Sequence, residues 1–256
     1  MATITISRET GADKGEFAHE LAKLLGYELL DKEIIGLVAR QIHAPESSVP
    51  DVDEVQEPQR PTGKIRALLE KILQEERNGV HAPQLSPWFA ENYPFEIPPY
   101  YDTDFQRYSK EMLTPKMKAL ARDLAVQGHA QIIHHFAEEG RVVIVGRGSQ
   151  VILKDVPWVF HLRLTASRAS RIANVAEKTG LPDDEAEKFM DRSDLWRARY
   201  VKDNFGADWN DVSLYHLVAN MDRWKSYKLA EAIAAIVKSE SYRQTLNDLK
   251  KHYGKF

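Results

Sequence analysis

Four cationic side chains occur at positions where phosphate chemistry would need them. Lys14 lies in a loop near the N-terminus, Arg147 stands between two glycines, and Arg192 and Arg199 are seven residues apart. Arginine suits phosphate because its planar guanidinium binds two oxygens at once. Phosphoryl transfer needs mainly such cations around the phosphate oxygens, a metal ion and aligned reactants. These residues therefore indicate a protein that handles a phosphorylated ligand.

The loop around Lys14 resembles a degraded P-loop. Lys14 falls at the lysine of the pattern G-x-x-x-x-G-K-[ST], and Gly11 and Gly15 would let backbone amides approach a phosphate. Both framing glycines are replaced, by Arg8 and Asp13, and the Ser or Thr hydroxyl that holds magnesium is missing. The candidate ATP-binding residues of this loop are Arg8, Thr10, Gly11, Ala12, Asp13, Lys14 and Gly15.

The same loop has a plainer interpretation. It can be a strand-to-helix turn in which Thr10 or Asp13 caps the following helix and Lys14 is solvated. Arg8 also has two interpretations. It replaces the lost backbone contacts with a charged one, or it closes the site by pairing with Glu9 or Asp31.

Two further candidates end predicted strands. Asp31 closes the segment YELLD, and Arg147 follows the apolar run VVIV after a single glycine. Ligands of α/β proteins bind at the carboxyl ends of parallel strands, so both residues are predicted to lie at a ligand site, and they are our candidates for binding the acceptor of a phosphoryl group. Asp31 could orient the acceptor or a magnesium-bound water, or simply cap the helix predicted from residue 32. Arg147 could instead fix a loop carbonyl or a neighbouring carboxylate.

The elements that must position these residues alternate along the chain. Strands are predicted at 2–6, 27–31, 141–145, 156–164 and 213–220, and helices at 17–25, 32–42, 104–139, 167–179, 181–206 and from about 224. Ser167 is the expected cap of one helix and Gly180 its stop. This order predicts a three-layer α/β/α fold with a parallel sheet of about five strands, a helical lid and a large insertion.

The region 181–206 is the predicted arginine-rich lid of a single domain that spans residues 1–256. Arg192 and Arg199 share one face of its helix, and Arg197 points away from them. The alternative is a solvated face whose arginines are neutralised by nearby aspartates. A second distinct region, 44–103, is rich in acids, prolines and aromatics, and we interpret it as an insertion that binds the acceptor or forms an oligomer interface.

Four segments, in order, resemble the cytidylate kinases, and most closely the divergent cytidylate kinase-like group. They are TITISRETGADKGEFAHELAKLLGYELLDKEII, VVIVGRGSQVIL, VFHLRLTASRASRI and EAEKFMDRSDLWRARYV. The resemblance covers about 1–42 and 118–240, and it implies a P-loop kinase fold, ATP with Mg²⁺, and phosphoryl transfer to a nucleoside monophosphate such as CMP. It further implies that Arg147 contacts the acceptor's phosphate, while Lys14, Arg192 and Arg199 act on the transferring group. The missing motif residues favour the alternative of a weak or inactive nucleotide-binding protein.

Composition excludes several other classes of protein. The chain has 256 residues, a net charge of −3 and no cysteine, so disulfides, thiolate metal sites and cysteine nucleophiles are ruled out. A chain without excess positive charge is not expected to bind a nucleic acid polymer. No apolar run approaches the roughly 20 residues that cross a membrane. We expect a cytoplasmic protein with a small nucleotide as its partner, self-association as a further option, and no side chains dedicated to a metal.

Overall fold

The computed structural model describes residues 2–31, 126, 129–130 and 132–253. Nearly all of these residues belong to one compact unit, which includes residues 1–31 and 136–252. The predicted insertion at 44–103, the helix predicted at 32–42 and most of the one predicted at 104–139 lie outside the described residues. None of the described helices is long and apolar enough to cross a membrane.

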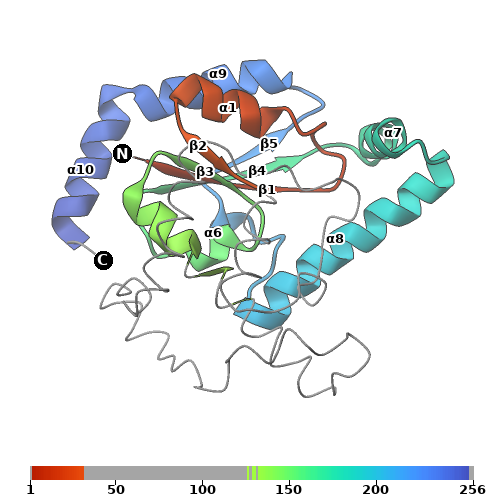
Figure 1. Cartoon of the computed structure of the whole chain (residues 1–256), viewed down its shortest axis with the longest axis horizontal. Helices are drawn as coiled ribbons and strands as arrows, with labels where there is room; N and C mark the ends of the chain where they lie inside the picture. The colour runs from red at the N-terminus through yellow and green to blue at the C-terminus, as the bar shows by residue number, and fades with distance from the viewer. Residues whose placement is uncertain (1, 32–125, 127–128, 131, 254–256) are drawn as a thin grey trace, which may run out of the picture. The chain divides into compact units, whose positions relative to one another are not determined.

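A parallel sheet forms the centre of this unit (Figure 1). Within the described part of the chain it has five strands in the order β2-β3-β1-β4-β5. Their bounds are Thr3–Arg8 for β1, Glu28–Leu30 for β2, Val142–Val145 for β3, Val159–Thr165 for β4 and Leu217–Asn220 for β5. The fold class predicted from the sequence, an α/β protein with a parallel sheet of about five strands, is confirmed.

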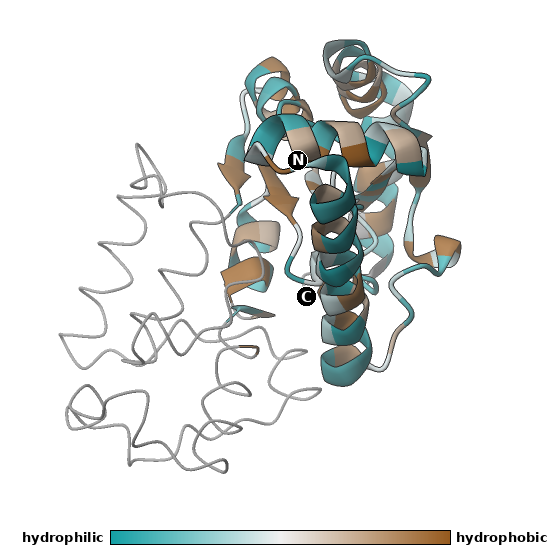
Figure 2. Cartoon of the chain, turned by 90° about the vertical axis from the view of Figure 1, so that its right-hand side faces the viewer, coloured by the Kyte–Doolittle hydropathy of each residue, from teal (hydrophilic) through white to brown (hydrophobic). Residues whose placement is uncertain are grey.

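The central strand β1 is buried because helices cover both faces of a parallel sheet. Ile4 and Ile6 are at most 1% exposed, and the β-branched threonines that alternate with them, Thr3 and Thr5, are equally buried. Buried hydroxyls need partners, and Thr5 Oγ1 has one in His161 Nδ1 at 2.7 Å. Figure 2 shows the strands as mainly hydrophobic and the surrounding helices as mixed.

Strand register brings three predicted site residues to the same edge of the sheet. Ile6 pairs with Val145, so Arg8 and Arg147 each lie two residues beyond an aligned pair. On the next strand Leu30 pairs with Ile144, which places Asp31 level with Val145. The register of the strands alone therefore brings these three polar residues to the carboxyl edge of the sheet.

Helices α1 (Phe17–Leu25) and α9 (Ser226–Lys238) cover one face of the sheet, and the short α6 (Ser149–Ile152) lies on the other (Figure 1). Helix α10 (Glu240–Tyr253) ends the described chain. Helix α1 stops at Gly26, where the backbone turns left-handed with φ of 66°, a conformation that glycine adopts without steric cost.

Helix α8 (Asp183–Phe205) forms the region predicted as a lid, and α7 (Arg168–Thr179) precedes it. Ser167 caps α7 by accepting the amide of Ser170, and Gly180 ends it, as expected. Near its start α8 packs on α7 through Met190 and Ala186, and near its end Val201 packs against Trp209. Because both ends of α8 are buried in apolar contacts, its orientation relative to the sheet edge is well defined.

Candidate functional site

An open pocket lies at the carboxyl edge of the sheet. About 630 Å³ of space lies between its walls when the adjoining open solvent is included. Its walls come from the ends of β1, β2 and β3, from α6 and from α8, and the lining residues are Ser7, Arg8, Asp31, Val145, Gly146, Arg147, Gly148, Gln150, Arg197, Tyr200, Val201 and Trp209. Three arginines and one carboxylate thus surround it, which makes the pocket suited to an anion.

Arg147 is held in an unusual backbone conformation. It has φ of 58°, and its neighbours Gly146 and Gly148 have φ of 74° and 71°. A left-handed conformation costs an L-residue roughly 1–2 kcal/mol, so this one persists because the fold imposes it. Glycine is required at 148, because a Cβ there would lie 2.6 Å from the ring of Phe205 on α8. The GRG turn therefore brings α8 close to β3 and makes Arg147 part of the pocket wall.

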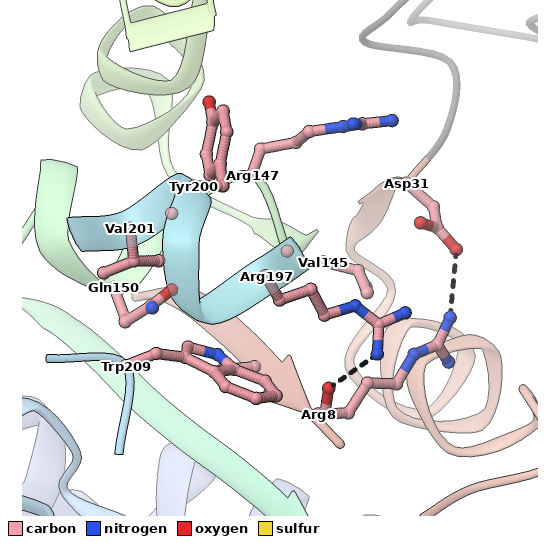
Figure 3. A pocket seen from close by; sticks show the side chains of 12 residues that line it. Arg8, Asp31, Val145, Arg147, Gln150, Arg197, Tyr200, Val201 and Trp209 are labelled. Carbon is pink, nitrogen blue, oxygen red and sulfur yellow. Dashed lines mark hydrogen bonds and ion pairs between the residues drawn. The ribbon is translucent and has the colours of Figure 1, made fainter. Parts of the chain in front are cut away.

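Arg8 joins two carboxylates from different elements. Its Nη2 lies 3.9 Å from Asp31 at the end of β2, and its Nη1 lies 3.6 Å from Asp13 in the loop. Figure 3 shows Arg8, Asp31 and Arg197 around the same pocket. Of the two interpretations offered for Arg8, the structure has the one in which it pairs with neighbouring acids, Asp31 among them.

Arg197 is the arginine of α8 that reaches the pocket. Its Nη1 donates to Thr10 Oγ1 at 2.6 Å and to the carbonyl of Arg8 at 3.3 Å, and it lies 3.5 Å from Asp194. Arg192 and Arg199 are exposed on the outside of the same helix and do not line the pocket. The expectation that Arg197 points away from these two is confirmed, and its consequence is that Arg197 faces the site.

Asp194 fastens α8 to the loop after β1. Its Oδ1 accepts the amide of Thr10 at 2.8 Å and the hydroxyl of Thr10 at 2.7 Å, and its Oδ2 pairs with Arg171 of α7. Arg171 also donates from Nε to the carbonyl of Thr10 at 2.9 Å. Charge-assisted hydrogen bonds of this kind are the strong ones, so the loop is held between α7 and α8 rather than free to move with either.

The loop uses several of its own amides internally. Four of them donate to oxygens of the chain itself: Glu9 to Leu164 at 3.1 Å, Thr10 to Asp194 at 2.8 Å, Ala12 to Glu9 at 3.0 Å and Gly15 to Asp13 at 3.0 Å. The chain also approaches α7 closely at Gly11, where a Cβ would lie 2.4 Å from a backbone oxygen of α7. Fewer amides therefore remain for a phosphate than in a regular P-loop.

The neighbouring loop residues Asp13 and Lys14 point in opposite directions. Asp13 is 1% exposed and points inward, where Ser226 of α9 donates to it at 3.1 Å. Lys14 is half-exposed and lies 2.5 Å from Glu177 on α7. In this structure the lysine predicted to bind phosphate is thus paired on the surface, and the aspartate occupies the interior of the loop.

Behind the loop lies a buried cation that the sequence reasoning did not include. Arg163 on β4 is 6% exposed, and its guanidinium lies 4.3 Å from the ring centre of Trp209. It donates to the carbonyl of Trp209 at 2.5 Å and to Asn210 at 2.9 Å, and it pairs with Glu9 at 3.5 Å. A charge in the apolar run VFHLRL was the available signal, since buried charges must be paired.

Tyr200 is the lining residue whose ionisation is most strongly affected. Burial raises the pKa of Tyr200 to about 12, and the positive charge of Arg147 opposes part of that rise. Its hydroxyl has no hydrogen-bond partner in the described part of the chain. The ring therefore stays neutral at physiological pH and contributes an apolar surface beside the arginines.

The structure thus brings together some of the predicted site residues and separates others. Arg8, Asp31 and Arg147 meet in the pocket, whereas Lys14 does not line it. Sequence reasoning missed Arg197, Asp194, Arg163, Arg171 and Trp209 as contributors. Arg168, on the same helix as Arg171, pairs with Asp191 at 2.7 Å on the surface. No group of three potential metal ligands occurs among the described residues.

Comparison with known proteins points to one family. Residues 3–223 match the family model described as the cytidylate kinase-like family. The chain is similar to the cytidylate kinase of Methanosarcina barkeri, with 24% identity over 137 residues, which are 51% of this chain and 74% of that protein. It is 35% identical to the cytidylate kinase of Pyrococcus horikoshii over 104 residues, 40% of this chain and 50% of that protein.

A solved structure shares the fold. It is that of an uncharacterized protein from Eubacterium ventriosum, with a TM-score of 0.55 and 14% identity, and the match covers 94% of this chain and all of that one. At this identity the likeness concerns the fold alone.

Proposed function

The chain belongs to the cytidylate kinase-like family, and from that premise we propose that it transfers the terminal phosphoryl group of ATP to a small acceptor. The acceptor we propose is a nucleoside monophosphate such as CMP. In this reaction an oxygen of the acceptor's phosphate forms a bond to the terminal phosphorus, the bond to the bridging oxygen breaks, and ADP leaves. The protein's part is to position the two reactants and to stabilise the negative charge.

One observation carries the proposal: Arg8, Arg147 and Arg197 all line one pocket at the carboxyl edge of the sheet. A phosphate monoester carries up to two negative charges, and each hydrogen bond to a charged group contributes about 1.5–3 kcal/mol. Asp31 is the one carboxylate among the lining residues, while Asp13 and Asp194 pair with Arg8 and Arg197 without lining the pocket. The guanidinium groups on the pocket wall favour an anionic ligand over a neutral or cationic one.

The arginines have different proposed roles. Arg147 holds the acceptor's phosphate from the β3 turn. Arg197 lies between the loop, at Thr10, and the pocket, so it is placed to act on a group that passes from donor to acceptor. Arg192 and Arg199 remain predicted to close over the transferring group, which requires α8 to turn its exposed face inward.

Magnesium would be shared between the protein and the nucleotide phosphates. Kinases commonly hold Mg²⁺ with one or two carboxylates, waters and substrate oxygens. Asp31 is the carboxylate that lines the pocket, so it would provide the protein's contribution. The ion would neutralise charge on the donor phosphates when it is bound.

A second candidate function is a nucleotide-binding protein with little or no catalysis. Two features favour it: Lys14 pairs with Glu177 on the surface, and Asp13 accepts the amide of Gly15 inside the loop. Both features reduce what the loop offers to a triphosphate. Such a protein would still bind a monophosphate in the arginine-lined pocket.

The test is a screen of the purified full-length chain against all nucleoside monophosphates with ATP, with and without Mg²⁺. Turnover is followed as ADP formation, and binding as a shift in melting temperature. At a ligand concentration of 100 times Kd the expected stabilisation is about 2.7 kcal/mol. Arg147→Ala is the control, because it should weaken the effect of the acceptor about 10- to 150-fold in concentration.

The two candidate functions predict different outcomes of this screen. Stabilisation by a monophosphate without turnover would contradict the kinase and support the nucleotide-binding protein. No stabilisation by any nucleotide at millimolar concentration would contradict both functions.

A further inference from the structure

We infer that Asp13 acts as an internal anion in the phosphate-binding loop and thereby sets how weakly the chain binds the polyphosphate of its donor. The inference rests on the proposed function, because it concerns the donor side of the same site. It makes Asp13 a specificity-determining residue at a position where the regular motif has a glycine.

The first support is the set of donors around the Asp13 carboxylate. Its Oδ2 accepts the amide of Gly15 at 3.0 Å and lies 3.6 Å from Nη1 of Arg8, and its Oδ1 accepts the hydroxyl of Ser226 at 3.1 Å. A backbone amide beside a glycine, a guanidinium and a hydroxyl are the kinds of donor that bind phosphate oxygens in proteins. The carboxylate therefore already satisfies groups that a donor phosphate would need.

The contacts of Asp13 extend beyond a local turn. The bond from Gly15 to Asp13 taken alone would be an ordinary Asx-turn. Ser226, however, belongs to α9 and is 213 residues away in the chain, and Arg8 comes from the central strand. With 1% of its side chain exposed, Asp13 is enclosed by these partners and cannot leave the loop without breaking all three contacts.

The third support is the geometry of the rest of the loop. Gly11 is packed against α7, and Lys14 is turned outward to Glu177. Neither residue offsets the negative charge of Asp13 inside the loop. A donor phosphate that enters the loop must displace this carboxylate or accept its repulsion, and either event weakens binding of the anionic part of the nucleotide.

The experiment compares nucleotide affinity in the wild-type chain and in Asp13→Asn and Asp13→Gly by isothermal titration calorimetry. The ligands are a non-hydrolysable ATP analogue, ADP and uncharged adenosine. Asparagine keeps the shape, and its single oxygen can still accept the Gly15 amide, while its NH2 group can donate to Ser226 Oγ. Asp13→Asn therefore removes the charge and keeps both contacts, with the direction of the Ser226 bond reversed. We expect at least a tenfold gain in affinity for the ATP analogue with Asp13→Asn, a larger gain with Asp13→Gly, and no change for adenosine.

Glu16→Gln is the matched control, because it removes the same charge from an exposed side chain of the same loop. It should change affinity for the ATP analogue by less than about threefold. An equal gain in Glu16→Gln would overturn the inference, since net charge would then explain it. Unchanged affinity in both folded Asp13 variants, as judged by their melting curves, would also overturn it.

The outcomes separate this inference from the proposed function. Acceptor turnover by the wild-type chain together with unchanged ATP affinity in the Asp13 variants would refute the inference alone. A gain in ATP affinity without turnover in any form would support the inference and count against the kinase. No nucleotide binding by any form, the variants included, would refute both.

Discussion

Replacements of Arg147 should change the stability of the fold and the affinity for the ligand in different ways. Its backbone has φ of 58°, a conformation that costs an L-residue roughly 1–2 kcal/mol and costs glycine almost nothing. Arg147→Gly removes that strain, while the added freedom of glycine in the unfolded chain takes back about 0.4–1 kcal/mol. Arg147→Ala keeps the strain. We therefore expect the glycine variant to be more stable than the alanine variant by about 0.5–1 kcal/mol.

Both variants should lose affinity for the acceptor. One or two hydrogen bonds between a guanidinium and a phosphate contribute about 1.5–3 kcal/mol each. Loss of one such bond lowers affinity about 10- to 150-fold, since each 1.4 kcal/mol is a factor of ten. Arg147→Lys should fall between wild type and alanine, because lysine keeps the charge without the planar fork.

The assay pairs urea unfolding of each variant with titration of the nucleoside monophosphate that gives the largest thermal shift. Arg141 provides the control, because it is the other non-glycine residue with a positive φ in the described chain, at 57°, and it does not line the pocket. Arg141→Gly should leave acceptor affinity unchanged. Wild-type affinity in Arg147→Gly would refute the assignment of the pocket. An alanine variant more stable than the glycine variant would refute the argument from strain.

Three further predictions concern the loop, the core and the lid. Gly11→Ala should destabilise the fold by roughly 2–5 kcal/mol and Gly15→Ala by about 1–2 kcal/mol, because both have a positive φ but only a Cβ at Gly11 meets a backbone oxygen, at 2.4 Å. Equal costs in urea unfolding would contradict the packing of the loop on α7. Burial lowers the pKa of His161 from 6.5 to about 4, so the unfolded chain binds a proton that the folded chain rejects. About 3 kcal/mol of stability, complete above pH 6.5, should be lost as the pH falls from 6.5 to 4, and a His161→Gln variant that kept the same slope would contradict this. Arg197→Ala should lower kcat about a hundredfold, and an equal loss in Arg199→Ala would mean that α8 turns its outer face inward during the reaction.

Local patterns in the sequence were enough to predict the fold. Runs of β-branched residues and amphipathic periodicity determine the secondary structure of the segment in which they occur. Glycines such as Gly26 and Gly180 end the helix that directly precedes them. Parallel strands place their carboxyl ends at one edge, so the meeting of Asp31 and Arg147 with the end of β1 also followed from the pattern. The observed register of β1, β2 and β3 agrees with this expectation, because it aligns the carboxyl ends of the three strands.

The tertiary structure decided which face of each element meets the site. Helical periodicity separates Arg197 from Arg192 and Arg199 but does not say which side faces the protein. That choice depends on Met190 and Val201, which bury the inner side of α8 against α7 and against Trp209. These apolar contacts join residues that are separated along the chain, and the pattern of a single sequence does not show which of them meet.

The same reason explains the loop. Glycine and lysine spacing predicted that Lys14 would face a phosphate, because the motif is read from neighbouring residues alone. In the folded chain Glu177, 163 residues away, pairs with Lys14, and Ser226, 213 residues away, binds Asp13. The sequence by itself determined that a loop with charges of both signs follows the first strand. Which of its charges turns inward was decided by partners that only folding brings into contact.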